Sequence, residues 1–302
     1  LADGSLLLEC CRQAEVAAAA SEVAAAPPLP LPSEGPTAAA LNLDPPSLDP
    51  VTLELFSHRF TAIAEQMGTR LQQTSSSVNI KERLDFSCAL FDAAGRLVAN
   101  APHIPVHLGS MGESVAALLA AVACGDRAPL QPGDVVVSNN PYNGGTHLPD
   151  ITVITPVFAA TGVGAGAPVA FVASRGHHAD VGGITPGSMP PHSTCIEEEG
   201  LLLDNVPLLR QGVLDEPWWR DRLSAGPWPV RNPEQLLADL RAQLAANQLG
   251  LERLQALIDA EGLAVLQAAM AQVQRQAAEA VRRVIDGLED GQALVELRSE
   301  EH

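Results

Sequence analysis

The chain has 302 residues, of which 46% are hydrophobic and 18% charged, so it can bury a sizeable core in one large domain or two smaller ones. Its formal net charge of −18 argues against a nucleic-acid backbone or an anionic membrane as partner. Lysine occurs once, at Lys81, outside any Gly-Lys-Ser/Thr sequence, which excludes a phosphate-binding loop of that kind.

Cysteine usage and hydropathy indicate where the protein works. The five cysteines are odd in number and irregularly spaced, without a Cys-x-x-Cys pair, which predicts reduced thiols and a cytoplasmic location. No apolar run reaches membrane-spanning length, and residue 1 is not followed by the basic and apolar order of a signal peptide. Cys195 is the right residue type for a nucleophile, but nothing near it indicates an activated thiol.

The first 50 residues differ in composition from the rest. Residues 6–10 have the pattern of a single strand, and an alanine-rich segment follows. Eight prolines then lie between residues 27 and 50, a density that neither a helix nor a central strand can sustain. Residues 27–50 are therefore predicted to be an extended linker.

An α+β core is predicted for residues 51–231. Asp49 is a suitable N-cap for a first helix, with Pro50 at its first position. The predicted elements are a helix at 51–73, strands at 86–91 and 97–99, a helix at 111–124, and strands at 135–137, 151–158 and 169–174. A glycine-rich run at 162–168 loosely resembles a dinucleotide fingerprint, but it leads into a strand, which favours a hairpin loop. The fold class is thus α+β, with a mixed or antiparallel sheet and flanking helices.

Residues 232–302 are predicted to be mainly helical. Asn232 is a good N-cap for a helix that Gly262 breaks, and a second helix runs to about residue 287. Two long helices joined at a glycine are expected to pack as an antiparallel hairpin, with apolar faces that serve the core. One terminal strand at 293–297 follows, without an obvious partner, and the chain ends abruptly.

Two glycine-rich polar clusters flank the strands at 151–158 and 169–174. In the first, His147 and Asp150 are three residues apart, and Pro149 excludes a regular helix through them. A tight turn would let both side chains reach one ion. Taken alone, such a pair is also typical of a hydrogen-bonded turn.

The second cluster follows the strand at 169–174 and contains His177, His178 and Asp180. Adjacent residues on an extended backbone point opposite ways, so only one of the two histidines would face a given ion. An antiparallel hairpin would place both clusters side by side. Two imidazoles and a carboxylate suit Zn, Mn or Fe and leave open positions for water or substrate, as in a catalytic site. A polar turn network without an ion is the alternative.

Three further residues are candidates for catalysis. Arg175 could hold a carboxylate or phosphate in bidentate fashion, or it could form a surface or core salt bridge. Glu199 ends a run of three glutamates and could act as a general base, although such runs are usually solvated. Asp180 and Glu199 are the acid/base candidates.

Five segments of the sequence resemble the hydantoinase B/oxoprolinase family, and especially the B-type domain of its 5-oxoprolinase branch. The resemblance covers about residues 48–297. The segments are residues 77–88 (SVNIKERLDFSC), 107–113 (HLGSMGE), 146–153 (THLPDITV), 175–183 (RGHHADVGG) and 186–190 (PGSMP).

This resemblance implies an ATP-dependent hydrolase of cyclic amides, such as 5-oxo-L-proline or hydantoins. It implies a divalent metal held by His147, Asp150 and one of His177 and His178. It also implies a partner, a hydantoinase A-type domain or subunit that binds ATP and Mg²⁺, in an oligomeric assembly. Residues 1–26 would then be the tail of such an upstream domain.

The chain departs from the family in length, because a B-type unit usually continues well beyond the helical hairpin. It therefore corresponds to the N-terminal part of that unit. This leaves two alternatives to lactam hydrolysis. One is a related hydantoin hydrolase or ketone carboxylase subunit, and the other is a catalytically silent fragment that only associates with an A-type partner.

Overall fold

The computed structural model describes residues 5–9, 48–102, 104, 107, 109–159, 166–289 and 292–296. The chain forms two compact units, one of Asn42–Gln274 and one of Leu1–Leu41 together with Arg275–His302. The larger unit contains both polar clusters. The predicted division between residues 51–231 and 232–302 falls inside this unit.

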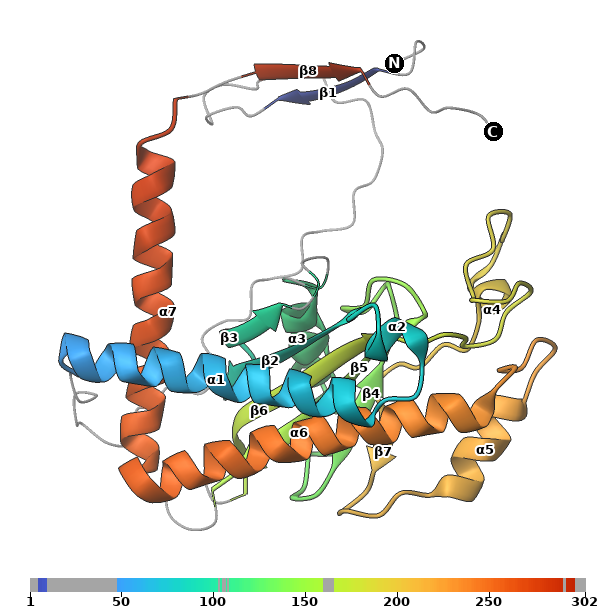
Figure 1. The fold of residues 1–302 in the computed structure, drawn as a ribbon, viewed down its shortest axis with the longest axis horizontal. Helices are drawn as coiled ribbons and strands as arrows, with labels where there is room; N and C mark the ends of the chain where they lie inside the picture. The colour runs from blue at the N-terminus through green and yellow to red at the C-terminus, as the bar shows by residue number, and fades with distance from the viewer. Residues whose placement is uncertain are drawn as a thin grey trace. The chain divides into compact units, whose positions relative to one another are not determined.

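A six-stranded sheet forms the centre of the larger unit, in the order β3-β2-β6-β5-β4-β7 (Figure 1). Its strands are β2 (Phe86–Asp92), β3 (Leu97–Pro102), β4 (Val135–Ser138), β5 (Asp150–Phe158), β6 (Pro168–His177) and β7 (Val206–Leu209). Every pair of neighbours is antiparallel. The predicted α+β class with an antiparallel sheet is confirmed.

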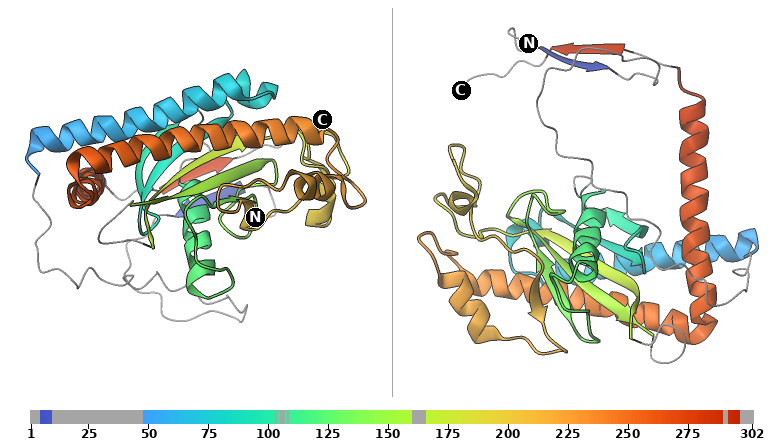
Figure 2. Two further views of the ribbon diagram at one scale, coloured as in Figure 1. Left: turned by 90° about the horizontal axis from the view of Figure 1, so that it is seen from below. Right: turned by 180° about the vertical axis from the view of Figure 1, so that it is seen from behind.

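Helices cover both faces of the sheet. α1 (Pro50–Thr74) and α6 (Pro233–Glu261) lie on one face, and α3 (Ser110–Ala123) lies on the other (Figure 2). Because strand residues alternate between faces, Leu90 of β2 joins the core beneath α1 and α6, whereas its neighbour Phe91 joins the core beneath α3. Because both faces of the sheet are covered, β2 and β5 are buried along their whole length.

The predicted helix starts are confirmed by their capping contacts. The Asp49 side chain accepts hydrogen bonds from the backbone N–H groups of Val51 and Thr52, at 3.0 and 3.1 Å. The Asn232 side chain accepts one from the N–H of Gln235 at 3.1 Å. Each cap satisfies backbone donors that the first helical turn leaves unpaired.

The predicted C-terminal helices are present, but they are not packed as an antiparallel pair. α7 (Leu263–Asp286) follows α6 after Gly262, and the two helices are bent by 113° at this break. α6 lies along α1 instead (Figures 1 and 2). Gly250 permits this close approach, since a Cβ there would stand 2.4 Å from Sδ of Met67. The periodicity identified the apolar face of α6 but not its partner.

The smaller unit contains a pair of antiparallel strands, β1 (Ser5–Glu9) and β8 (Gln292–Glu296). The sequence predicts both strands but identifies no partner for the second. The structure pairs it with the strand at the other end of the chain. Residues 10–47 hold most of the predicted tail and linker and lie outside the described residues. Those two predictions stay predictions.

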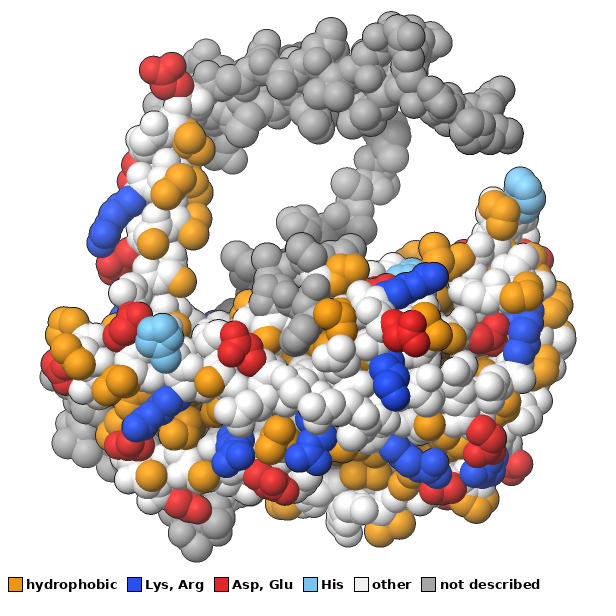
Figure 3. All heavy atoms as spheres, in the orientation of Figure 1, with side chains coloured by type: hydrophobic (Ala, Val, Ile, Leu, Met, Phe, Trp, Pro, Cys, Tyr) orange, Lys and Arg blue, Asp and Glu red, His pale blue; other side chains and the backbone are white. Residues whose placement is uncertain are grey.

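Three short helices complete the larger unit: α2 (Val78–Lys81), α4 (Ile196–Glu199) and α5 (Glu216–Ser224). Acidic and basic side chains are interspersed over the face that carries α1 and α6 (Figure 3). Arg59 of α1 pairs with Glu261 of α6 at 2.8 Å. Exposed ion pairs contribute only about 0–1 kcal/mol each, so the apolar core holds these helices in place.

Within the described part of the chain, no single helix is long and apolar enough to cross a membrane. The bent pair of α6 and α7 passes that test of length and composition only when the two helices are taken together.

Candidate metal centre

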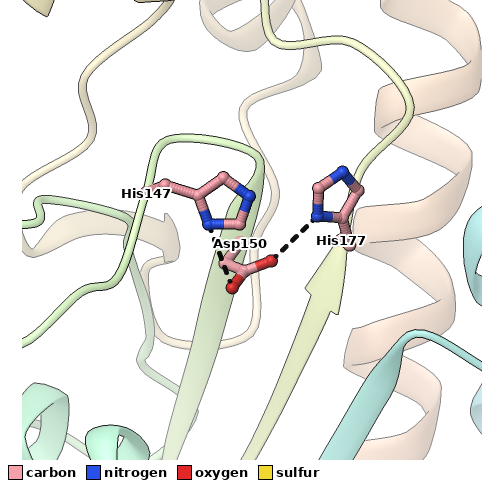
Figure 4. A group of neighbouring side chains, drawn as sticks. All are labelled: His147, Asp150 and His177. Atoms are coloured by element: carbon pink, nitrogen blue, oxygen red, sulfur yellow. Dashed lines mark hydrogen bonds and ion pairs between the residues drawn. The ribbon is translucent and has the colours of Figure 1, made fainter. Parts of the chain in front are cut away.

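The pairing of β5 with β6 places Asp150 directly opposite His177. His147 lies in the turn before β5 and faces the same carboxylate (Figure 4). Nδ1 of His177 is 3.1 Å from Oδ1 of Asp150, and Nδ1 of His147 is 3.2 Å from Oδ2. Ligand-type atoms of the three side chains all lie within 4.8 Å of one another, a spacing that one ion could bridge.

The three side chains differ in exposure and in charge. The Asp150 side chain is 3% exposed, whereas that of His147 is 33% exposed and opens the cluster to solvent. Burial raises the pKa of the Asp150 carboxyl, but hydrogen bonds from the surrounding histidines and Thr146 outweigh it and hold that pKa well below its usual range. Burial lowers the pKa of His177, but its hydrogen bond and attraction to Asp150 outweigh burial and raise it. Without an ion, the cluster therefore favours a proton on His177 beside an ionised carboxylate.

The turn before β5 is held by side chains that donate hydrogen bonds to its backbone carbonyls. The Asn139 side chain donates to the carbonyl of Leu148 at 2.7 Å, and the Ser114 hydroxyl of α3 donates to the carbonyl of Gly144 at 2.6 Å. Gly144 has a φ of +81°, and a Cβ there would stand 2.5 Å from the carbonyl oxygen of Glu113. The turn can approach α3 only because glycine occupies this position.

We expect Gly144→Ala to destabilise the protein by about 2–4 kcal/mol, because it combines a left-handed backbone with a steric clash. Gly187→Ala is the matched control, since Gly187 has a φ of +80° and no atom within 4 Å of its virtual Cβ. It should cost only the conformational part, about 1 kcal/mol. Urea unfolding of both variants measures the difference, and equal losses would contradict the close approach to α3.

Arg175 lies beneath the cluster and is fully buried. Its guanidinium donates to three hydroxyl groups and one carbonyl oxygen, those of Thr152, Ser114, Ser110 and Gly144. Burial lowers the pKa of Arg175 to about 10, and the charge of Asp150 acts in the opposite direction. These partners are neutral oxygens and not the carboxylate of a salt bridge, and a role of Arg175 in catalysis stays a prediction.

The structure separates the two adjacent histidines. His178 is 1% exposed, and its Nε2 lies 3.0 Å from Oε1 of Gln243 on α6. Consecutive residues of an extended strand point to opposite sides, so His177 faces the cluster and His178 faces the helix. Burial lowers the pKa of His178, which favours a neutral imidazole. Of the predicted ligand candidates, the structure brings together His147, Asp150 and His177.

The two predicted acid/base residues have other partners. Oδ2 of Asp180 accepts from Nη1 of Arg231 at 2.7 Å, and its Oδ1 accepts from the backbone N–H of Gly182 at 3.0 Å. Oε1 of Glu199 accepts from the Ser193 hydroxyl at 3.0 Å. Neither carboxylate belongs to the cluster that the described residues form. Their roles in catalysis stay predictions.

Two residues near the cluster were missed by sequence reasoning. Nε2 of the fully buried His107 lies 3.4 Å from Oδ2 of Asp150. The Asp85 carboxylate lies 3.9 Å from Nδ1 of His177, and the Asp85 carbonyl accepts from the His177 N–H at 2.9 Å. Both residues stand in segments that carry the family resemblance, residues 77–88 and 107–113. Only the pairing of β2 with β6 could have linked Asp85 to His177, and no local spacing indicates it.

The donor set fits a divalent ion. Two imidazoles and one carboxylate suit the borderline metals, and the exposed side of His147 leaves coordination positions for water or substrate. Nε2 of the buried His107 also approaches Oδ2 of Asp150, but at 3.4 Å it is beyond the distance of a good hydrogen bond, so more nitrogen atoms surround this carboxylate than it pairs with closely. His147, Asp150 and His177 are the residues that would hold the ion.

Comparisons with known proteins identify the family to which this chain belongs. A profile of the hydantoinase B/oxoprolinase family matches residues 49–300. 5-Oxoprolinase 1 of Arabidopsis thaliana is 49% identical over 83% of this chain and 20% of its own length. 5-Oxoprolinase of Saccharomyces cerevisiae is 46% identical over 79% of this chain and 18% of its own length. This chain thus spans about a fifth of the curated 5-oxoprolinases that it matches.

A similar solved structure is the crystal structure of an ATP-dependent caprolactamase from Pseudomonas jessenii. It has a TM-score of 0.70 and 27% identity, and the match covers 82% of this chain and 40% of the caprolactamase chain. Together, the profile and the relatives show that this chain belongs to the hydantoinase B/oxoprolinase family.

Proposed function

We propose that this chain is the metal-holding part of an ATP-dependent hydrolase of cyclic amides of the 5-oxoprolinase type. The observation that carries this proposal is the cluster of His147, Asp150 and His177, in a chain 49% identical to a 5-oxoprolinase. The proposed reaction opens 5-oxo-L-proline to L-glutamate. Because the chain spans only about a fifth of such relatives, the activity is proposed for an assembly that includes further protein.

The chain's own side chains would hold and orient the reacting groups. A divalent ion, when bound, supplies a Lewis acid for the amide carbonyl and can activate water. Asp150 contributes the negative charge, and the Thr146 hydroxyl fixes its orientation by donating to Oδ2 at 2.7 Å. His177 would hold an ion as a neutral imidazole, so the proton that Asp150 favours on its ring would be released on binding. Substrate would approach from the exposed side of His147.

ATP would be bound by another part of the assembly, because this sequence has no phosphate-binding loop of the Gly-Lys-Ser/Thr kind. A hydantoinase A-type domain or subunit is the proposed partner. It would bind ATP with Mg²⁺ and activate the carbonyl oxygen of the lactam for attack. The similarity to an ATP-dependent caprolactamase supports this division of labour. A cytoplasmic location and an oligomeric assembly stay predictions.

The ligand assignment is tested by His147→Ala. We expect this variant to lose its bound metal, and the assembly that contains it to lose lactamase activity, because only one imidazole and one carboxylate remain. Metal content after desalting is measured by mass spectrometry. His58→Ala is the control, since His58 is an exposed histidine of α1 that pairs with Glu54. Unchanged metal content in His147→Ala would refute the assignment.

Two alternatives are separated by an assay with and without the A-type partner. The assay measures ATP hydrolysis that depends on 5-oxoproline, hydantoin or acetone, and it identifies the products. A lactam is favoured because the caprolactamase is 27% identical to this chain and two 5-oxoprolinases are 46% and 49% identical to it. Activity with hydantoin or acetone alone would indicate a related hydrolase or carboxylase. Association with the partner without any turnover would indicate a catalytically silent fragment.

A further inference from the structure

α6 carries a polar stripe on the side that faces the sheet. Asp239, Gln243 and Asn247 stand four residues apart along the helix, and each is at most 1% exposed. The core face of a helix is normally apolar, and a buried polar group is costly unless it is hydrogen-bonded. The hydrogen bonds that these residues make therefore indicate why they are there.

Gln243, the middle residue, reaches the ends of both strands that carry the metal cluster. Its Nε2 donates to the carbonyls of Ile151 at 2.9 Å and Ser174 at 3.1 Å. Its Oε1 lies 3.0 Å from Nε2 of His178. Ile151 directly follows Asp150, and His178 directly follows His177.

These contacts also fix the proton on His178. Both N–H bonds of the Gln243 amide are directed at carbonyl oxygens, so its Oε1 must act as an acceptor. Nε2 of His178 therefore carries the donated hydrogen. The backbone N–H of His178 donates in turn to the carbonyl of Pro149 at 2.8 Å, inside the turn between His147 and Asp150. A continuous line of hydrogen bonds thus runs from α6 to the turn that carries the cluster.

We propose that Gln243 is a positioning residue for the metal centre. Gln243 holds Asp150 and His177 at ligand spacing before an ion binds. It does so through the backbone of β5 and β6 and through the side chain of His178. This role rests on the proposed function. Residues that orient metal ligands in this way typically change metal affinity by about 10–100-fold when they are removed.

The matched pair Gln243→Leu and Asn247→Leu tests the proposal. Asn247 is equally buried, and its Nδ2 donates to the Val153 carbonyl at 2.9 Å and to the Thr155 hydroxyl at 3.2 Å, farther along β5 from Asp150. Both substitutions replace an amide by leucine on the same face of α6. They should lower the melting temperature of the metal-free protein by similar amounts.

Zn²⁺ and Co²⁺ affinities of the whole chain are measured by competition with a chelator at fixed pH. We expect Gln243→Leu to weaken binding by about 10–100-fold and to alter the visible spectrum of bound Co²⁺. Asn247→Leu should leave the Zn²⁺ and Co²⁺ affinities within about threefold of wild type and the Co²⁺ spectrum unchanged, since it leaves the cluster's own contacts intact. Equal changes in the two variants, or none in Gln243→Leu, would overturn the positioning role.

Should Gln243→Leu fail to fold, His178→Phe removes only one of the three hydrogen bonds of Gln243. It should then weaken ion binding by a smaller factor, with a shifted Co²⁺ spectrum. Unchanged affinity in that variant would count against the proposal. A wild-type protein that binds neither ion would overturn the proposed function as well, whereas normal wild-type binding with insensitive variants overturns the positioning role alone.

Discussion

Asp150→Asn should abolish retention of the metal ion, with a loss of affinity greater than the roughly 100-fold upper range for residues that only orient ligands. The substitution keeps the shape of the side chain and removes its charge, which is the one negative charge in the cluster of three. An amide oxygen is a weak ligand for a borderline divalent ion beside two imidazoles. Metal content after desalting and the Kd from chelator competition give the result.

The same variant has a second readout that does not require metal. The hydrogen bond and attraction of Asp150 raise the pKa of His177 against burial, so in metal-free Asp150→Asn that pKa should fall. Titration of the ring signals by NMR measures it. In wild type, the stabilisation from a raised pKa is complete below the unfolded-state value of 6.5 and is lost as pH rises through the folded-state pKa. The stability difference between wild type and Asp150→Asn should therefore narrow as pH rises.

Asp180→Asn is the matched control for metal content. It makes the same chemical change at a carboxylate that pairs with Arg231 instead of the cluster histidines. It should keep its metal and leave the His177 titration unchanged. Metal loss in both variants, or in neither, would contradict the assignment of Asp150 as the central ligand.

The sequence predicts the meeting of the two polar clusters because strand ends joined by a hairpin lie side by side. It does not decide between His177 and His178, since alternation shows only that they face opposite ways. The choice depends on the register that sets Asp150 opposite His177, and a shift of one residue would exchange the two histidines. In the observed register, Gln243 of α6 donates to both strands, to the carbonyls of Ile151 and Ser174, and local sequence patterns do not contain such contacts.

Other features depend on contacts between distant parts of the chain. Asp85 reaches the cluster through the pairing of β2 with β6, about 90 residues apart in sequence. The partner of β8 lies at the opposite end of the chain. The periodicity of α6 indicates an apolar face equally suited to α1 or α7. The need for glycine at position 250 can be seen only once Met67 of α1 is known to pack against it. Local propensity thus identifies elements, and packing decides their neighbours.

Arg175→Met should destabilise the metal-free protein by about 3–5 kcal/mol, the range for breaking a buried charged network. Methionine fills much of the same volume but leaves the hydroxyls of Thr152 and Ser114 without the guanidinium donors. It also removes the positive charge that faces the buried carboxylate of Asp150. Arg175→Lys should not restore stability, because one ammonium cannot reproduce the planar fork that reaches these groups together.

Urea unfolding in the presence of a chelator isolates this effect from metal binding. Arg96→Met is the control, since Arg96 pairs with Asp92 at 2.8 Å but its side chain is 68% exposed. An exposed pair contributes about 0–1 kcal/mol, so this variant should remain close to wild type. If Arg175→Met loses no more unfolding free energy than Arg96→Met, the hydrogen bonds of Arg175 do not stabilise the metal centre, and the apolar core alone holds it. Full stability in Arg175→Lys would show that charge suffices there without the directed hydrogen bonds.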